Sequence, residues 1–203
     1  MDSKNKIQTK QGDDDVSPAS KLFKVMKEGP IEVKVVFFGL DGAGKTTLLY
    51  ALKMGQIIKT MATIGFNVET IDYKDTSITM WDVGGQDKIR ILWKHYIREM
   101  SGFIYCVDST DKQRLEESKT ELENFLKHDG FTKNEFLLIV SMKNGSDQES
   151  LSLFEISEKF NLEELLKDRK WTIKQIGSLD SMRDPNFFND CYEWINETVR
   201  ETK

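Results

Sequence analysis

The sequence predicts an α/β fold: a six-stranded, doubly wound, mostly parallel sheet with one antiparallel edge strand and helices on both faces. The first observation is that short apolar segments alternate with longer amphipathic ones from Ile31 onward, which is the order of strands and helices around a parallel sheet. The second is a short polar turn, Tyr73-Lys74-Asp75-Thr76, between two of the apolar segments. Such a turn joins them as a hairpin and places one antiparallel strand at the edge.

Each expected element rests on its own pattern. Short apolar or alternating segments are typical of strands, and we expect strands at residues 33–38, 66–72, 77–81, 103–107, 136–141 and 171–176. Apolar residues at helical spacing predict helices at residues 45–54, 112–127, 153–160, 162–167 and 186–199. In the last of these helices an apolar stripe faces the core: Phe188, Tyr192, Ile195 and Val199. In this architecture a ligand binds at the carboxyl ends of the strands.

Length and composition limit the class of protein. A chain of 203 residues lies within the range of one domain, and 31% charged with 38% hydrophobic residues is typical of a soluble globular protein. No segment approaches the roughly 20 apolar residues that cross a bilayer. The formal charge of −5 provides no broad cationic surface for nucleic acid. Cys106 and Cys191 make neither a disulfide framework nor a metal cluster, so we expect a cytoplasmic protein.

The N-terminal region divides into two predicted parts. Residues 1–17 are polar and acidic without periodicity, so we expect a flexible tail. Residues 18–29 predict a short basic amphipathic helix with Ser17 as its N-cap. Its apolar face either packs on the domain or lies on a membrane surface, and the sequence leaves both open. That face consists of Leu22, Phe23 and Met26, and residues 30–203 form the remaining domain.

The most specific motif is Gly39-Leu40-Asp41-Gly42-Ala43-Gly44-Lys45-Thr46, which matches G-x-x-x-x-G-K-[ST]. It follows a predicted strand and opens a predicted helix, as a phosphate-binding loop of the P-loop NTPase type requires. Main-chain N–H groups and the helix dipole face the anion, the lysine adds charge and the threonine hydroxyl reaches Mg²⁺. We therefore expect the chain to bind a nucleoside di- or triphosphate with magnesium.

A second motif, Asp82-Val83-Gly84-Gly85-Gln86, follows the strand that ends at Trp81. An aspartate at a strand end can hold the magnesium shell, and a glycine lets the main chain approach a terminal phosphate. The amide of Gln86 offers a donor and an acceptor with which to orient an attacking water. The alternative for Gln86 is an exposed loop residue without a catalytic role.

Together these residues resemble the ADP-ribosylation factor (Arf) family of small GTPases. The likeness runs from about Ala19 to the C-terminal helix and is carried by residues 39–47, 62–70 and 81–90. The resemblance implies that Lys45 contacts the β- and γ-phosphates and that Thr46 and Thr63 bind Mg²⁺. It also implies that Gly85 senses the γ-phosphate and that Gln86 positions water. The implied nucleotide-binding residues are Gly39, Leu40, Asp41, Gly42, Ala43, Gly44, Lys45, Thr46, Thr47, Thr63, Asp82 and Gly85.

The resemblance further implies GDP and GTP as ligands, a monomer, and a switch in vesicle traffic that depends on exchange factors, GTPase-activating proteins and effectors. In this family the hairpin, here residues 66–81, slides between nucleotide states and displaces the N-terminal helix. Asp2 stands where myristoylated members have glycine, so no acyl chain can be attached. We expect a cytoplasmic protein that reaches the Golgi or other endomembranes peripherally, through Leu22, Phe23 and Met26 together with a protein receptor.

The chain departs from the family at the loop that reads the guanine base. Where the family has N-K-x-D, the aligned residues are Met142-Lys143-Asn144-Gly145. A shift of two residues would use Asn144-Gly145-Ser146-Asp147 instead, with Asp147 as the base reader. The later base-contacting loop also differs, at Gly177-Ser178-Leu179. We expect phosphate and magnesium binding to survive, while base discrimination depends on which arrangement forms.

Three functions remain open. The first is an Arf-like GTPase that hydrolyses GTP slowly, favoured by the intact Thr63 and Gln86. The second is a nucleotide-binding pseudo-GTPase with relaxed base choice that works as a regulated scaffold, favoured by the altered base loop. The third, a metabolic P-loop kinase or ATPase, is disfavoured because no segment resembles a second-substrate site or a lid. Residues after Gln86 are expected to form a surface that effectors read: Leu92, Trp93, His95 and Tyr96.

Overall fold

The computed structural model describes residues 29–56, 58–128, 130–132, 134–142, 150–176 and 185–202. The tail and helix expected over residues 1–28, with Leu22, Phe23 and Met26, lie outside these residues. So do the base-loop residues Lys143, Asn144, Gly145 and Asp147, and Gly177-Ser178-Leu179. The chain divides into two units, Met1–Pro30 and Ile31–Lys203, and the second carries the fold. Among the described helices, none combines the length and apolar character that a membrane span needs.

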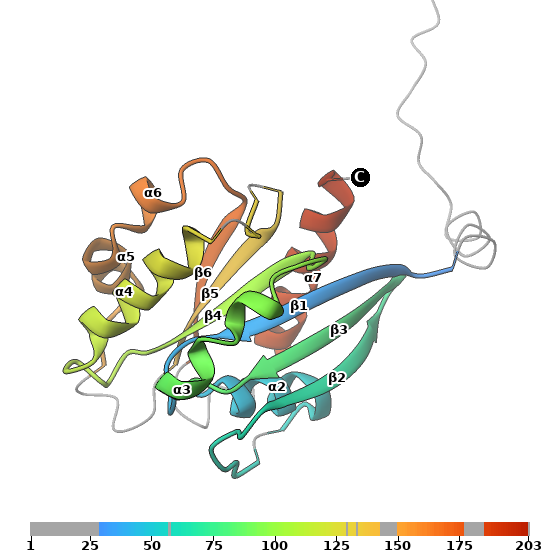
Figure 1. Cartoon of the computed structure of the whole chain (residues 1–203). Helices are drawn as coiled ribbons and strands as arrows, with labels where there is room; N and C mark the ends of the chain where they lie inside the picture. The colour runs from blue at the N-terminus through green and yellow to red at the C-terminus, as the bar shows by residue number, and fades with distance from the viewer. Residues whose placement is uncertain are drawn as a thin grey trace, which may run out of the picture. The chain divides into compact units, whose positions relative to one another are not determined.

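Six strands form one sheet in the order β2-β3-β1-β4-β5-β6 (Figure 1). Only β2 runs antiparallel, paired with β3, and it lies at the edge. The other neighbours pair in parallel. This arrangement confirms the predicted fold class, including the hairpin and its edge strand. The strands are β1 (Ile31–Phe38), β2 (Phe66–Tyr73), β3 (Thr76–Val83), β4 (Gly102–Asp108), β5 (Phe136–Met142) and β6 (Trp171–Ile176).

The helices agree with the expected ones, with two differences. The helix expected from residue 112 begins at Leu115, because residues 111–114 form a turn in which the Arg114 N–H donates to the Asp111 main-chain and side-chain oxygens. Two short helices, α3 and η1, were not expected, since three or four residues are too few to establish a period. The helices are α2 (Lys45–Met54), α3 (Asp87–Arg90), η1 (Trp93–His95), α4 (Leu115–Leu126), α5 (Leu153–Phe160), α6 (Leu162–Leu165) and α7 (Pro185–Thr202).

The sheet separates two apolar cores. Helices α2 and α7 cover one face, while α4, α5 and α6 cover the other (Figure 1). Strand β4 supplies both cores, because Ile104 and Cys106 point to the first face and Phe103 and Tyr105 to the second. A strand buried on both faces has apolar residues at consecutive positions instead of alternating with polar ones. The expected core stripe of α7 packs in the first core.

The pairing of β1 places the two sequence motifs side by side. Strand β1 lies between β3 and β4, and Phe37 near its end pairs with Asp82 of β3. The loops that leave β1 and β3 therefore emerge next to each other at the carboxyl edge of the sheet. The neighbours of β1 in the sheet are β3 on one side and β4 on the other. The carboxyl end of β1 is therefore the topological switch point, where doubly wound folds bind ligands.

Candidate functional site

A pocket of about 350 Å³ opens at this edge of the sheet. It joins the loop after β1, the segment before β2, the loop after β3 and the end of β4. Four segments that are far apart in the sequence thus meet around one hollow. The lining residues are Asp41, Gly42, Gly44, Lys45, Thr46, Thr47, Thr60, Met61, Ala62, Thr63, Gly84, Gly85, Gln86 and Asp108.

The loop from Gly39 to Gly44 has the form of a phosphate cradle. Gly42 and Gly44 adopt left-handed φ angles of 75° and 85°, which turn the chain sharply into α2. Gly44 is the N-cap of α2 and offers no side-chain hydrogen bond, so the first N–H groups of the helix keep no side-chain cap. Uncapped N–H groups at a helix start bind anions well. The side chains of Leu40 and Ala43 are buried, so only the main-chain atoms of these two loop residues can contact a ligand.

Lys45 spans the cradle from the first position of α2. Its Nζ donates hydrogen bonds to the main-chain oxygens of Gly39 at 2.8 Å and Leu40 at 2.7 Å. Burial removes water from the ammonium group and lowers the pKa of Lys45. A buried cation in an anion cradle gains most from a bound phosphate, because the low dielectric that disfavours the lone charge strengthens its pairing.

Thr46, Thr63, Asn67 and Asp82 form a polar cluster, of which Thr46 and Thr63 line the pocket. The Asp82 Oδ2 atom accepts hydrogen bonds from Thr46 Oγ1 at 2.7 Å, Asn67 Nδ2 at 2.9 Å and Thr63 Oγ1 at 3.2 Å. The two threonine hydroxyls lie 2.8 Å apart. Asp82 is fully buried, and its second oxygen, Oδ1, has no hydrogen-bond partner among the described residues.

This cluster fits a magnesium ion. Mg²⁺ prefers oxygen ligands and is commonly completed by water and substrate phosphates, with only one or two protein ligands. Thr46 and Thr63 offer hydroxyl ligands, and the buried Asp82 carboxylate supplies the charge behind them. A buried carboxylate oxygen without a partner carries a free-energy cost that a nearby cation would remove. The metal assignment of Thr46 and Thr63 is thus compatible with the geometry.

Asn67 is a site residue that the motif analysis missed. It lies directly opposite Asp82 in the antiparallel register of β2 and β3. The signal was present in the hairpin, because counting back from the Tyr73–Thr76 pair brings Asn67 to Asp82. The register of a hairpin follows from its turn, so a turn assigned in the sequence also assigns the cross-strand pairs.

Gly85 presses directly against the phosphate loop. A Cβ atom at this position would lie 2.5 Å from the Asp41 main-chain nitrogen and the Gly39 main-chain oxygen. Only glycine therefore fits at this position, which lies on the wall of the pocket. Gln86 follows as the N-cap of α3, exposed and on the pocket wall. Its side-chain amide makes no hydrogen bond to the described residues, so both polar atoms remain available.

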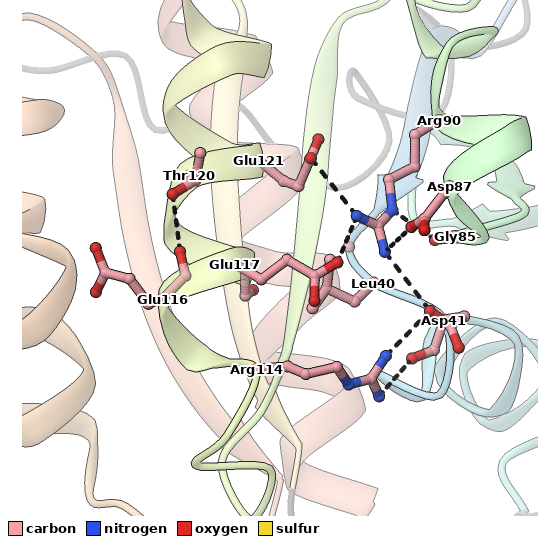
Figure 2. Close-up of polar contacts among 12 residues, drawn as sticks. Leu40, Asp41, Gly85, Asp87, Arg90, Arg114, Glu116, Glu117, Thr120 and Glu121 are labelled. Carbon is pink, nitrogen blue, oxygen red and sulfur yellow. Dashed lines mark hydrogen bonds and ion pairs between the residues drawn. The ribbon is translucent and has the colours of Figure 1, made fainter.

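Arg90 joins the Gly85 segment to helix α4 (Figure 2). Its Nε donates to the Gly85 main-chain oxygen at 2.7 Å, and its NH1 donates to Glu117 at 2.7 Å. The Arg90 side chain is only 9% exposed. Three further carboxylates surround it, with nitrogen–oxygen distances of 2.9 Å to Asp87, 3.5 Å to Glu121 and 3.6 Å to Asp41. Burial alone disfavours the charge, but the Glu117 hydrogen bond and the other carboxylates together raise the pKa of Arg90.

Asp41 of the phosphate loop is held from a second direction by Arg114. The Arg114 guanidinium donates to the Asp41 carboxylate at 3.1 Å and to its main-chain oxygen at 3.2 Å. Its Nε is fixed by Asp111 at 2.7 Å. Figure 2 shows Arg90 and Arg114 reaching Asp41 from the α3 and α4 sides. The phosphate loop and the loop after β3 therefore share one rigid support, the start of α4.

Two of the predicted site residues have unexpected neighbours. Met142, at the end of β5, is fully buried, and its Cε would lie 2.8 Å from a Cβ atom on Gly44. The Met142 side chain therefore supports the phosphate loop from below and does not line the pocket. Thr47 links α2 to the segment before β2, because its hydroxyl lies 3.0 Å from that of Thr60.

The aromatic surface differs from the expected one. Trp93 was expected on the surface, but it is 4% exposed and its Nε1 donates to the Gly84 oxygen at 3.0 Å. The expectation was wrong because the indole fills the space over Phe38, whose ring centre lies 5.0 Å away. Instead Phe66, Trp81 and Tyr96 gather their rings at 5.4–6.4 Å, and Phe66 remains half exposed.

Comparison with known proteins places the chain in a family. The family model described as "ADP-ribosylation factor family" matches residues 19–199. ADP-ribosylation factor J and ADP-ribosylation factor K of Dictyostelium discoideum are each 43% identical over 180 residues, covering 89% of this chain and 92% of the relative. Among solved structures, the Arl6 BBS3 small GTPase of Trypanosoma brucei with the bound nucleotide analogue GppNp aligns with a TM-score of 0.72 and 27% identity, covering 85% of this chain and 99% of the other. The chain therefore belongs to the ADP-ribosylation factor family of small GTPases.

Proposed function

We propose that this chain is a guanine-nucleotide switch that binds GDP and GTP with Mg²⁺ and hydrolyses GTP slowly in intracellular membrane traffic. One observation carries the proposal. The Lys45, Thr46 and Thr63 side chains meet at one pocket from the start of α2 and the segment before β2, and both threonine hydroxyls donate to the buried Asp82 carboxylate at the end of β3. Membership of the Arf family supports guanine nucleotides as the ligands.

The switch itself would depend on Thr63 and Gly85. They lie on two separate segments that meet, since a Cβ on the neighbouring Gly84 would be 2.8 Å from the Thr63 main-chain oxygen. A terminal phosphate can bind a threonine hydroxyl from one segment and a glycine N–H from the other, and its loss releases both. The trypanosomal Arl6, described with GppNp bound, supports a triphosphate at the corresponding place.

Hydrolysis would use Gln86 and the electrostatics of the loop. The amide of Gln86 would orient a water molecule for in-line attack, and Lys45 would stabilise negative charge on the phosphates. Magnesium, held by Thr46 and Thr63, would neutralise charge on the phosphate oxygens. Among the described residues that line the pocket, Lys45 is the only cation. A site with so little positive charge turns over slowly, and an activating protein that adds a cation would accelerate it.

Base selection is the part of the proposal that departs most from the family pattern. Met142 provides packing beneath Gly44 in place of the asparagine of N-K-x-D. We propose that guanine is read by residues after Met142, with Asp147 as the acceptor for the two ring donors. The second hypothesis, a pseudo-GTPase scaffold, receives no support from the matches to Arf-family proteins.

The proposed partners and location are those expected of a member of the Arf family. We propose that exchange factors, GTPase-activating proteins and effectors act on this protein, and that effectors contact the cluster of Phe66, Trp81 and Tyr96. Peripheral attachment to Golgi or other endomembranes would use Leu22, Phe23 and Met26. Flotation of the GTP-loaded protein with liposomes tests this attachment. Equal flotation of wild type and a Leu22→Ala/Phe23→Ala variant would count against it.

The central experiment separates nucleotide choice from turnover. Labelled GDP, GTP, ADP and ATP are titrated with magnesium, and single-turnover hydrolysis is then measured for wild type and Gln86→Leu. The switch predicts tight guanine-selective binding and turnover that Gln86→Leu abolishes without loss of binding. Equal affinity for adenine and guanine nucleotides contradicts guanine recognition, and unchanged turnover in Gln86→Leu contradicts the role of Gln86.

A further inference from the structure

A second hollow, of about 570 Å³, lies away from the nucleotide pocket. It is formed by η1, by the segment that follows η1 and by the turn after α4. The lining residues are Lys94, His95, Arg98, His128 and Gly130. Four of these five carry basic side chains, and the hollow contains both histidines of the chain. We call it the basic hollow.

The basic side chains of this hollow have no partners among the described residues. Lys94, His95, Arg98 and His128 are exposed, and none of their side chains forms a hydrogen bond or ion pair with another residue that the structure describes. Several other cations of the domain are neutralised locally: Arg90 by Glu117, Arg114 by Asp111, Lys74 by Glu193 and Lys170 by Glu201. The positive charges of Lys94 and Arg98 are therefore not neutralised by other described residues.

The charge of the hollow is opposite to that of the whole chain. The chain carries a formal charge of −5, yet no carboxylate belongs to the described lining. The adjacent Glu99 lies 4.0 Å from Lys34 and does not line the hollow. Charges of one sign around a concave surface add their fields and raise the local concentration of counter-ions. The described lining of the hollow thus carries two positive charges, those of Lys94 and Arg98, on a protein of net negative charge.

We propose that the basic hollow binds a small anion that carries two or more phosphate groups. Guanidinium, ammonium and imidazolium groups are the donors that bind phosphate oxygens. Its volume lies within the range of small-molecule sites. The described lining holds no aromatic carbocycle and no large apolar side chain, so these residues offer neither a stacking surface for a nucleobase nor a pocket for the apolar residues of a peptide. A compact polyphosphorylated group matches this lining best.

The basic hollow and the nucleotide pocket lie at opposite ends of α4. Arg114, which precedes α4, contacts Asp41 of the phosphate loop, whereas His128 follows the last turn of the helix. A helix of 12 residues is about 18 Å long. A phosphate probe can therefore be assigned to one site or the other by substitutions that touch only one of them.

The test uses the full chain and inositol trisphosphate as a soluble probe. Isothermal titration is carried out with wild type, Lys94→Gln/Arg98→Gln and, from the other wall of the hollow, His95→Gln/His128→Gln. Lys94→Gln/Arg98→Gln removes two exposed cations and should weaken binding roughly tenfold. His95→Gln/His128→Gln removes two imidazole hydrogen-bonding groups without changing the formal charge, so it should weaken binding less. The matched control is Lys119→Gln/Lys159→Gln. It removes two cations from a smaller hollow between the first turns of α4 and the end of α5, which also contains Glu116, and it should bind like wild type.

Further arms identify the source of the phosphate and the place of binding. Vesicles of phosphatidylcholine with or without phosphatidylinositol bisphosphate show whether a lipid headgroup also binds, and binding of either source supports the proposal. Equal binding by wild type and both hollow variants overturns it, as does an equal loss in the Lys119→Gln/Lys159→Gln control. Loss of probe binding in Lys45→Ala alone would place the probe in the phosphate loop and would also overturn the proposal. No binding of either probe would exclude a polyphosphate ligand and leave an acidic protein segment as the alternative.

Discussion

The Nε atom of Arg90 donates a 2.7 Å hydrogen bond to the main-chain oxygen of Gly85, the residue before Gln86. The same guanidinium is held by Glu117 of α4 at 2.7 Å. The segment that would carry the water-positioning glutamine is thus attached to a helix of the rigid core through one side chain. Because the first residues of the phosphate loop share this support through Asp41, both sides of the pocket depend on Arg90.

Loss of Arg90 should weaken both the fold and the proposed hydrolysis. Arg90→Met removes two charge-assisted hydrogen bonds and leaves nearby carboxylates without their counter-charge, so we expect a loss of about 1–3 kcal/mol in the free energy of unfolding. Single-turnover hydrolysis should slow several-fold while nucleotide affinity changes less, because Gly85 and Gln86 lose their anchor. Urea unfolding and single-turnover assays measure the two effects.

The control for Arg90 is Lys88→Met on the same short helix, because Lys88 is exposed and has no partner among the described residues. Arg90→Lys keeps the charge without the two-sided hydrogen bonding and should fall between wild type and Arg90→Met. If Arg90→Met unfolds and hydrolyses like Lys88→Met, Arg90 does not position the segment.

Lys45→Ala should abolish phosphate binding and leave the fold intact. The ammonium group is the only cation on the described wall of the pocket, and charge-assisted hydrogen bonds contribute about 1.5–3 kcal/mol each. We expect the affinity for nucleotide to fall on the order of a hundredfold or more, with a normal unfolding transition by circular dichroism. Lys59→Ala, which removes an exposed lysine next to Thr60, is the matched control. Unchanged affinity in Lys45→Ala would refute the assigned role.

Asn67→Ala should make nucleotide retention more dependent on magnesium. The Asn67 amide donates to Asp82 Oδ2 at 2.9 Å and fixes that carboxylate beneath Thr46 and Thr63. Residues that orient metal-site groups typically change metal affinity about 10–100-fold when mutated. Dissociation of labelled GDP at graded magnesium concentrations measures the shift. Val68→Ala changes the neighbouring residue on β2 without touching Asp82, and the same shift in both variants would contradict the role of Asn67.

Alkaline pH should destabilise the domain partly through Cys106. Burial raises the pKa of the Cys106 thiol from its ordinary 9.0 to about 12. The unfolded chain therefore loses this proton near pH 9 while the folded chain keeps it, so the contribution to stability is complete below that pH and disappears as pH rises toward 12. Between these two pKa values, each unit rise in pH lowers the free energy of unfolding by roughly 1.4 kcal/mol because of this one thiol.

Urea unfolding at several alkaline pH values tests this dependence. Cys106→Ala should show a shallower fall of stability with pH than wild type, even though its stability at neutral pH is lower because of the lost packing. Cys191, whose thiol pKa burial also raises to about 12, and the buried Tyr105 keep part of the slope in that variant. Identical slopes in wild type and Cys106→Ala would show that the thiol does not contribute.

Local patterns in the sequence determined the strands, most helices and the phosphate loop. The apolar segments, the glycine turn after residue 38 and the hairpin turn all act over a few residues, where steric and periodic rules are strongest. Even the pairing of Asn67 with Asp82 follows from the Tyr73–Thr76 turn, because the register of a hairpin is set by its turn. The exact start of α4 did not follow, since a local hydrogen bond to Asp111 replaced the first helical turn.

Only the tertiary structure decided which distant side chains meet. Arg90 and Glu117 lie on separate elements, and nothing in their spacing predicts that they pair across the pocket rim. The neighbours of Trp93 on both sides in the sequence are exposed, yet Trp93 is buried because its ring packs on Phe38 and its N–H donates to the Gly84 oxygen. Met142 supports Gly44 for the same reason, since β5 ends beneath the loop. Such contacts depend on the packing of whole elements against one another, which local sequence patterns do not encode.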